Sequence, residues 1–273
     1  MTTRRTVFFV SDRTGITAEA LGLSLLTQFT GFDFKKRTLS FIDSEEKAHS
    51  AAEQVRHASE KDGVAALIFS TQITDEYRDI LIESGGVMFD FFESFISKME
   101  QTLGTESSHA AGRSHGIDRD SNYSGRIHSI NFALNNDDGA TTKYYEEADI
   151  ILTGVSRSGK TPTCLFLALQ YGILAANYPL IEEDLNTHKL PEILRNHKEK
   201  LFGLSINPVR LHKIRSERRG NSRYASLDQC QREVRRAEEI YHSNKVRFVD
   251  TSQVSIEEIA TIILDKTGLK RRY

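Results

Sequence analysis

The sequence has little cysteine, little net charge and no long apolar run, and each shortage excludes a class of protein. Its only two cysteines, Cys164 and Cys230, make neither a disulfide framework nor a zinc-binding pattern, and they fit a reducing compartment. No apolar run approaches the roughly 18 residues of a membrane span. The apolar run 7–10 is too short for a signal peptide. A net charge of −2 argues against general affinity for nucleic acid or membranes. From the cysteine usage we expect a cytoplasmic protein.

Short apolar runs alternate with helical patterns along the chain. This alternation predicts an α/β fold in which parallel sheets are joined by helical crossovers. The predicted strands are 7–10, 38–42, 64–69, 150–152, 175–180, 201–206 and 246–249. Residues 87–99 are predicted to be helical. We expect an N-terminal α/β unit over 1–100, a loop-rich connection over 101–145 and a C-terminal phosphate-loop, nucleotide-binding unit over 146–273.

One motif points to specific chemistry. Residues 154–161 read GVSRSGKT, which matches the phosphate-binding pattern G-x-x-x-x-G-K-T, and we call them the glycine loop. The run 150–152 before them is typical of a buried strand and 164–169 after them of a helix start, which is the context that phosphate binding requires. The residues expected to bind nucleotide are Gly154, Val155, Ser156, Arg157, Ser158, Gly159, Lys160 and Thr161.

The residue types of the glycine loop suit a phosphate ligand. Gly154 and Gly159 adopt backbone angles that other residues resist, so the loop amides can point at an anion. Lys160 can reach a terminal phosphate, and the Thr161 hydroxyl can ligate Mg²⁺. The alternative is a chance match to the pattern, against which the flanking strand and helix argue.

Small polar side chains gather after the first predicted strand, at the end of a sheet where ligands bind in open α/β folds. They are Ser11, Asp12, Thr14 and Thr17. These side chains suit a phosphate or a phosphorylated residue. The alternative is a helix cap in a solvated turn.

Three carboxylates are candidates for metal or proton chemistry. Asp137 and Asp138 suit a metal ligand and a general base, or else a surface turn before Gly139. Asp250 ends an apolar run, as the second metal-binding carboxylate does in many phosphate-loop proteins. The signal from Asp250 is weak because many strands end in Asp.

Basic side chains form two further candidate sites. Arg113 and His115 lie in a polar stretch and could close over a phosphate, or belong to a plain polar loop. A second group follows Asn207 and could clamp phosphates, dock an acidic partner or simply form a solvated helix face. Its members are Arg210, Lys213, Arg215, Arg218, Arg219 and Arg223.

Together these motifs resemble the bacterial phosphoenolpyruvate synthase regulatory proteins, a group that includes related regulators of pyruvate, phosphate dikinase. The likeness extends over nearly the whole chain and is densest at residues 154–163. The other similar stretches are 11–12, 14, 17–19, 115–116, 137–139, 175–179, 201–204 and 221–227. Cys164 stands where the family commonly has Ser, and Arg13 stands where a small residue is common. Neither departure touches the core of the glycine loop.

The resemblance implies a bifunctional enzyme. One activity is an ADP-dependent serine/threonine kinase that inactivates phosphoenolpyruvate synthase by phosphorylating a threonine near that enzyme's catalytic histidine. The other reverses this with inorganic phosphate and releases pyrophosphate. By the same resemblance, residues 154–161 bind ADP, Thr161 binds Mg²⁺, and Lys160 neutralises charge on the transferring phosphoryl group.

The resemblance leaves several roles open. Asp12 or Asp138 would orient the target threonine, and Arg13, Arg113 and His115 are candidates for the inorganic-phosphate site. The synthase is the expected partner, with the dikinase as the alternative, and the oligomeric state is open between monomer and homodimer. An ordinary ATP-dependent small-molecule kinase and a non-catalytic nucleotide-sensing protein are the rival functions, because a fold does not determine a function.

Overall fold

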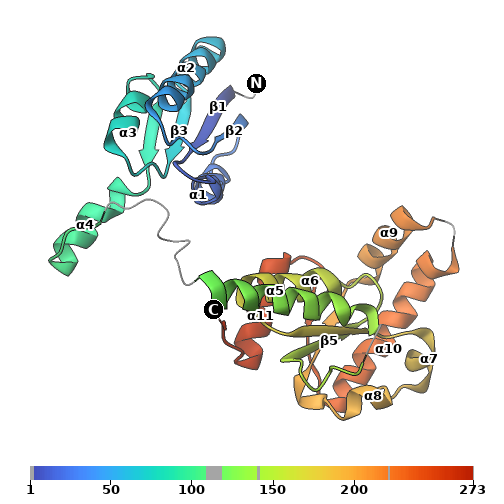
Figure 1. The fold of residues 1–273 in the computed structure, drawn as a ribbon. Helices are drawn as coiled ribbons and strands as arrows, with labels where there is room; N and C mark the ends of the chain where they lie inside the picture. The colour runs from blue at the N-terminus through green and yellow to red at the C-terminus, as the bar shows by residue number, and fades with distance from the viewer. Residues whose placement is uncertain (1–2, 109–118, 140–141, 221, 273) are drawn as a thin grey trace. The chain divides into compact units, whose positions relative to one another are not determined.

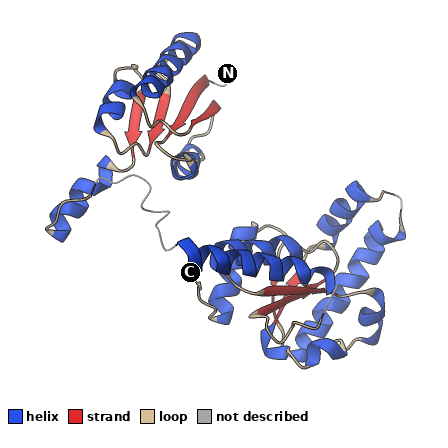
Figure 2. Ribbon diagram, viewed as in Figure 1, coloured by secondary structure: helices blue, strands red, loops and turns tan. Residues whose placement is uncertain are grey.

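The computed structural model describes residues 3–108, 119–139, 142–220 and 222–272. The chain forms two compact units, Met1–Ile117 and Asp118–Tyr273, and each is described by itself (Figure 1). Both are α/β units whose four-stranded sheets are flanked by helices (Figure 2). Among the described residues, we find no helix that combines the length and the apolar character needed to cross a membrane.

The N-terminal unit is built on a parallel sheet with the strand order β2-β1-β3-β4. Its elements are β1 (Thr3–Val10), α1 (Ile16–Leu26), β2 (Phe32–Leu39), α2 (Glu45–Asp62), β3 (Leu67–Ser70), α3 (Asp75–Ile82), β4 (Val87–Asp90) and α4 (Glu93–Leu103). Residues 7–10 of β1 are wholly buried because the sheet is covered on both faces. Phe8 packs among side chains of α2, and Phe9 packs against Ala18 of α1.

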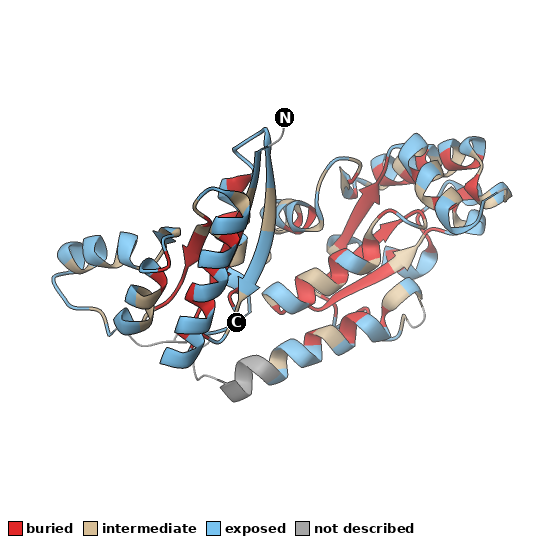
Figure 3. Cartoon of the chain, turned by 90° about the horizontal axis from the view of Figure 1, so that it is seen from above, coloured by how far each residue is buried: buried red, intermediate tan, exposed pale blue. Residues whose placement is uncertain are grey.

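The C-terminal unit is also built on a parallel sheet, with the order β6-β5-β7-β8. Its elements are α5 (Arg119–Asn135), η2 (Asp137–Gly139), β5 (Ile150–Gly154), α6 (Lys160–Tyr171), β6 (Ala175–Pro179), α7 (Glu182–Thr187), α8 (Glu192–Arg195), η3 (Lys198–Lys200), β7 (Leu201–Ser205), α9 (Pro208–Arg218), η4 (Arg223–Ala225), α10 (Leu227–Asn244), β8 (Arg247–Asp250) and α11 (Ile256–Thr267). One core cluster joins the sheet to α10, and the other joins it to α6 and α11. Strands β5 and β7 are buried along their whole length, and the flanking helices are exposed on their outer faces (Figure 3).

The predicted α/β class with parallel sheets is confirmed, but some elements differ from the prediction. The segment 87–99, predicted to be one helix, is β4 followed by α4, because Val87 pairs with Leu67 of β3 at the sheet edge. The predicted strand 38–42 is misplaced: β2 runs from Phe32 to Leu39 and pairs with all of β1, so only its last two residues fall in the predicted range. The predicted loop-rich connection over 101–145 includes α5, which is held to the C-terminal unit by the buried residues Ser129 and Phe132. The Ser129 hydroxyl donates a hydrogen bond to the Gly172 carbonyl oxygen at 2.9 Å.

Candidate active site

The glycine loop connects the end of β5 to the start of α6, as the sequence predicts. Gly154 permits a close approach, because a Cβ atom there would lie 2.6 Å from the Leu204 carbonyl oxygen and 2.8 Å from the Ser158 hydroxyl. Gly159, which precedes α6, has a φ of 96°, which is costly for any residue with a side chain. Arg157 adopts a positive φ of 75° in the same loop, so the loop holds backbone strain at a non-glycine residue as well.

Lys160 is the first residue of α6 and is almost fully buried. Its ammonium group donates a hydrogen bond to the Val155 carbonyl oxygen at 3.1 Å, so the side chain folds back along the loop. Burial lowers the pKa of Lys160 to about 8, while the charges of Asp138 and then Asp137 act in the opposite direction. The loop therefore keeps a poorly hydrated cation beside two carboxylates.

Asp137 and Asp138 lie in the short helix η2, which the structure brings to the start of α6. The Thr161 hydroxyl donates to an Asp137 carboxylate oxygen at 2.7 Å, and the Asn177 side-chain amide donates to the same oxygen. The Asp138 backbone N–H in turn donates to the Asn177 side-chain oxygen at 3.0 Å. Asn177 is a buried residue of β6, so a strand of the sheet fixes both aspartates next to Thr161. Asn177 lies in a stretch that carries the family resemblance, but its residue type alone did not indicate this role.

The two aspartates differ in what they can do. Asp137 is half-buried and its carboxylate is engaged by Thr161 and Asn177. Asp138 is exposed, has a positive φ of 49°, and its carboxylate makes no hydrogen bond to any residue that the structure describes. Asp137 is thus suited to hold a cation together with the Thr161 hydroxyl, and Asp138 is free to accept a proton.

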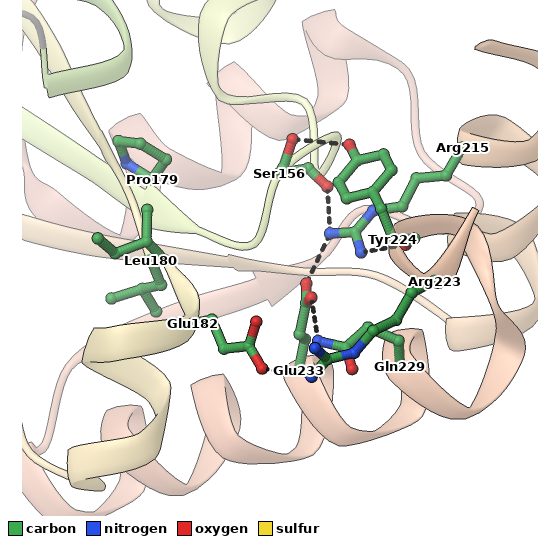
Figure 4. A pocket seen from close by; sticks show the side chains of 10 residues that line it. Ser156, Pro179, Leu180, Glu182, Arg215, Arg223, Tyr224, Gln229 and Glu233 are labelled. Carbon is green, nitrogen blue, oxygen red and sulfur yellow. Dashed lines mark hydrogen bonds and ion pairs between the residues drawn. The ribbon is translucent and has the colours of Figure 1, made fainter. Parts of the chain in front are cut away.

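A buried arginine holds the other side of the glycine loop. Arg215 of α9 is completely buried, and one of its guanidinium nitrogens donates to the Ser156 carbonyl oxygen at 3.0 Å and to Glu233 at 2.7 Å (Figure 4). Another nitrogen donates to the Tyr224 carbonyl oxygen at 3.0 Å, and the guanidinium carbon lies 4.2 Å from the Tyr224 ring centroid. The hydroxyls of Ser156 and Tyr224 are 2.9 Å apart.

Of the alternatives for the basic group, the solvated helix face is therefore wrong for Arg215. Leu211 lies four residues earlier and is also buried, so helical spacing places both on the inward face of α9. The four-residue spacing of Leu211 and Arg215 could have predicted that both face inward. The many basic residues around Arg215 favoured the interpretation of an exposed charged helix instead.

The remaining candidates are distributed over the chain. Asp250 accepts the Ser252 backbone N–H at 2.8 Å, whereas its neighbour Thr251 reaches the loop with its hydroxyl 3.1 Å from the Ser158 carbonyl oxygen. Asp12 is a buried residue of the N-terminal unit that follows β1, and it accepts a hydrogen bond from the Ser11 hydroxyl at 3.3 Å.

Two predicted residues cannot be placed. Arg113 and His115 lie outside the described residues, with the rest of segment 109–118. Of the predicted catalytic residues, the structure thus brings together Lys160 and Asp138.

The arrangement has the chemistry of an anion and hard-cation site. Within the described ranges, no group of three or more His, Cys, Asp and Glu side chains is placed to hold a metal ion. A hydroxyl and a carboxylate are nevertheless the oxygen donors with which proteins bind Mg²⁺ when substrate phosphates supply other ligands. The Thr161 hydroxyl and the Asp137 carboxylate therefore suit Mg²⁺ as ligands. The buried Ser158 hydroxyl has no partner among the described residues and is a further polar group within the loop.

Comparison with known proteins identifies the family of this chain. The family described as Kinase/pyrophosphorylase matches residues 7–264. A protein of Alkalilimnicola ehrlichii is 56% identical over 269 residues, which cover 98% of each chain. A protein of Stutzerimonas stutzeri is 52% identical over 98% of this chain and 99% of its own. One from Pseudomonas aeruginosa is 51% identical over 100% of both chains. All three are provisionally named phosphoenolpyruvate synthase regulatory proteins.

Proposed function

Because the chain belongs to the kinase/pyrophosphorylase family, we propose that it is a bifunctional regulatory enzyme that acts on phosphoenolpyruvate synthase. In one direction it transfers a phosphoryl group from ADP to a threonine of the synthase and inactivates it. In the other it transfers that group to inorganic phosphate and reactivates the synthase. The names of relatives that match this chain over its full length support the choice of target.

One observation carries the proposal: Lys160, Thr161, Asp137 and Asp138 meet where the glycine loop enters α6. Phosphoryl transfer depends mainly on positioning and on charge stabilisation, because the phosphoryl group carries charge on three oxygens. A loop whose amides and lysine bind the phosphate oxygens would provide both. The exposed carboxylate of Asp138 provides a proton acceptor next to the same lysine.

In the kinase direction, the threonine oxygen forms a bond to the β-phosphorus of ADP as the bond to the bridging oxygen breaks. The products are phosphothreonine and AMP, and Asp138 accepts the hydroxyl proton. Lys160 and the loop amides hold the phosphate oxygens during the transfer. Mg²⁺, held by Thr161 and Asp137, would supply further neutralisation of the phosphate charge.

In the reverse regulatory direction, an oxygen of inorganic phosphate bonds to the phosphorus of phosphothreonine. The threonine oxygen leaves, takes a proton and is restored as a hydroxyl, and the product is pyrophosphate. Because both directions pass the phosphoryl group over the same loop, Lys160 serves both. Replacing Lys160 with Ala is therefore expected to abolish both activities together.

The test is transfer to purified phosphoenolpyruvate synthase with Mg²⁺, using β-labelled ADP and γ-labelled ATP in separate reactions. We expect threonine labelling and loss of synthase activity with ADP, and recovery of activity with release of pyrophosphate on adding inorganic phosphate. Labelling with ATP and not with ADP would show that the assignment of ADP as phosphoryl donor is wrong. Labelling only of pyruvate, phosphate dikinase would change the target, and nucleotide binding without any transfer would identify a sensor.

A further inference from the structure

A groove rich in arginine lies beside the glycine loop in the C-terminal unit. It consists of a cavity that Ser156 of the loop lines (Figure 4) and an adjoining cavity, with volumes of about 280 Å³ and 230 Å³. The two cavities share Glu182, Arg223, Gln229 and Glu233. We call this surface the arginine groove. Its charged residues are Arg215, Arg223, Arg232, Arg236, Glu182 and Glu233.

The charge of the arginine groove opposes that of the chain. Four arginines and two glutamates line it, so the groove carries a charge of +2 in a protein whose net charge is −2. A concave surface with an excess of one charge concentrates ligands of the other sign. Arginine is well suited to bind phosphate, because its planar guanidinium can donate two parallel hydrogen bonds.

Three arginines of the groove can offer donors to a ligand, whereas the fourth, Arg232, pairs with Asp228 at 3.0 Å. Arg223 pairs with Glu182 at 2.6 Å, but both side chains are largely exposed, so this ion pair contributes little and is easily exchanged for another anion. Arg236 donates to the neutral Asn186 side chain and has no carboxylate partner among the described residues. The Nε of Arg215 is buried and has no acceptor within the described part of the chain.

We propose that the arginine groove binds a phosphate group other than that of the nucleotide in the glycine loop. This inference rests on the proposed function, which requires a second phosphate compound at the site: inorganic phosphate or the phosphothreonine of the protein substrate. Ser156 of the glycine loop lines one cavity of the groove, Arg236 lines the other, and Arg223 lines both, so the groove begins at the loop. Arg223 exchanges Glu182 for the phosphate, and Arg236 adds a second guanidinium.

The test measures equilibrium binding of inorganic phosphate and of a short phosphothreonine peptide to the full chain in excess ADP. The double variant Arg223→Ala/Arg236→Ala is expected to bind at least roughly tenfold more weakly, since it loses charge-assisted hydrogen bonds. The matched control is Arg235→Ala, which removes an exposed arginine of α10 that lines neither cavity. It should change affinity less than twofold.

A second variant keeps every arginine. Glu182→Gln removes the carboxylate that competes for Arg223 and should tighten phosphate binding several-fold. Binding of inorganic phosphate alone would identify it as the ligand, binding of the peptide alone would identify phosphothreonine, and mutual competition would show one site for both. Equal affinity of the double variant and the Arg235→Ala control for both probes would overturn the proposal.

The binding assay needs no turnover, so it separates this proposal from the proposed function. If phosphate binding depends on the groove arginines but the protein transfers no phosphoryl group from ADP, the proposed function is wrong and the proposal for the arginine groove stands. If the protein transfers phosphate from ADP but substitution of Arg223 and of Glu182 leaves phosphate binding unchanged, the proposed function stands and the arginine groove is excluded as the phosphate site.

Discussion

Replacing Lys160 with methionine should abolish phosphate transfer and, at pH 7, make the C-terminal unit more stable. Lys160 is almost fully buried, and its pKa is about 8 rather than the ordinary 10.5. At 1.36 kcal/mol for each pH unit, holding the charge there costs roughly 3 kcal/mol. Methionine has a similar length and carries no charge. It leaves the Val155 carbonyl without its donor, which costs roughly 1–2 kcal/mol, so we expect a net gain of about 1–2 kcal/mol.

The pH dependence of the free energy of unfolding tests independently whether the buried Lys160 charge destabilises the native state. Between pH 8 and 10.5 the native state has released the Lys160 proton while the unfolded chain still holds it. The free energy of unfolding of the unsubstituted protein therefore rises with pH in this window and is lowest, as far as Lys160 contributes, below pH 8. From pH 7 to pH 9.5 the rise is roughly 2 kcal/mol, and the methionine variant lacks it. The advantage of the variant should therefore vanish by pH 9.5.

Urea unfolding followed by circular dichroism measures both effects, since the chain has no tryptophan to report by fluorescence. Because the chain has two compact units, only the transition of the C-terminal unit should shift. Lys213→Met, at an exposed position of α9, is the control and should leave the free energy of unfolding within about 0.5 kcal/mol. A variant that is less stable at pH 7, or a difference from the unsubstituted protein that does not change with pH, would refute the reasoning.

Three further substitutions test the loop and its supports. Arg215→Ala should lower the free energy of unfolding, measured in urea, by about 3–5 kcal/mol, because it leaves the Glu233 carboxylate without its ion-pair partner. A loss below about 1 kcal/mol would contradict this. Asp138→Asn should lower kcat by roughly 10²–10⁴ in steady-state kinetics with little change in KM for ADP, and an unchanged kcat would exclude Asp138 as the base. Gly154→Ala should cost roughly 1–3 kcal/mol and weaken ADP binding in calorimetry, since its Cβ would meet the Leu204 carbonyl; normal binding would show that the loop adapts.

The sequence was sufficient to predict the fold class, because central parallel strands are buried on both faces and must be apolar throughout. Residues 7–10 and 150–152 have this character and lie in β1 and β5. Strand β4 escaped the prediction because it is a four-residue edge strand whose exposure alternates, and so short a segment shows no clear period. Helix α5 was not predicted from the sequence because a polar helix is stabilised by the elements it packs against. Here these contacts include the carbonyl oxygen of Gly172.

Part of the candidate site could likewise be predicted locally. The spacing of Gly154, Gly159, Lys160 and Thr161 within eight residues specifies a turn that suits phosphate, because backbone freedom and helix start are properties of adjacent residues. Asp137 and Asp138 were recognised as candidates, but their residue types fit a surface turn equally well, and only the family resemblance singled them out.

Only the tertiary structure decided which candidates meet. Thr161 lies 24 residues from Asp137 along the chain, and Asn177 of β6 holds the aspartates in place from 40 residues away. Arg215 contacts Ser156 across 59 residues, and folding buries it although the nearby cations Lys213 and Arg218 are exposed. Local composition predicts elements because a helix or strand depends on its own side chains. Contacts between elements depend on the order of strands in the sheet and on which helix covers which face, and this packing is what assembles the site.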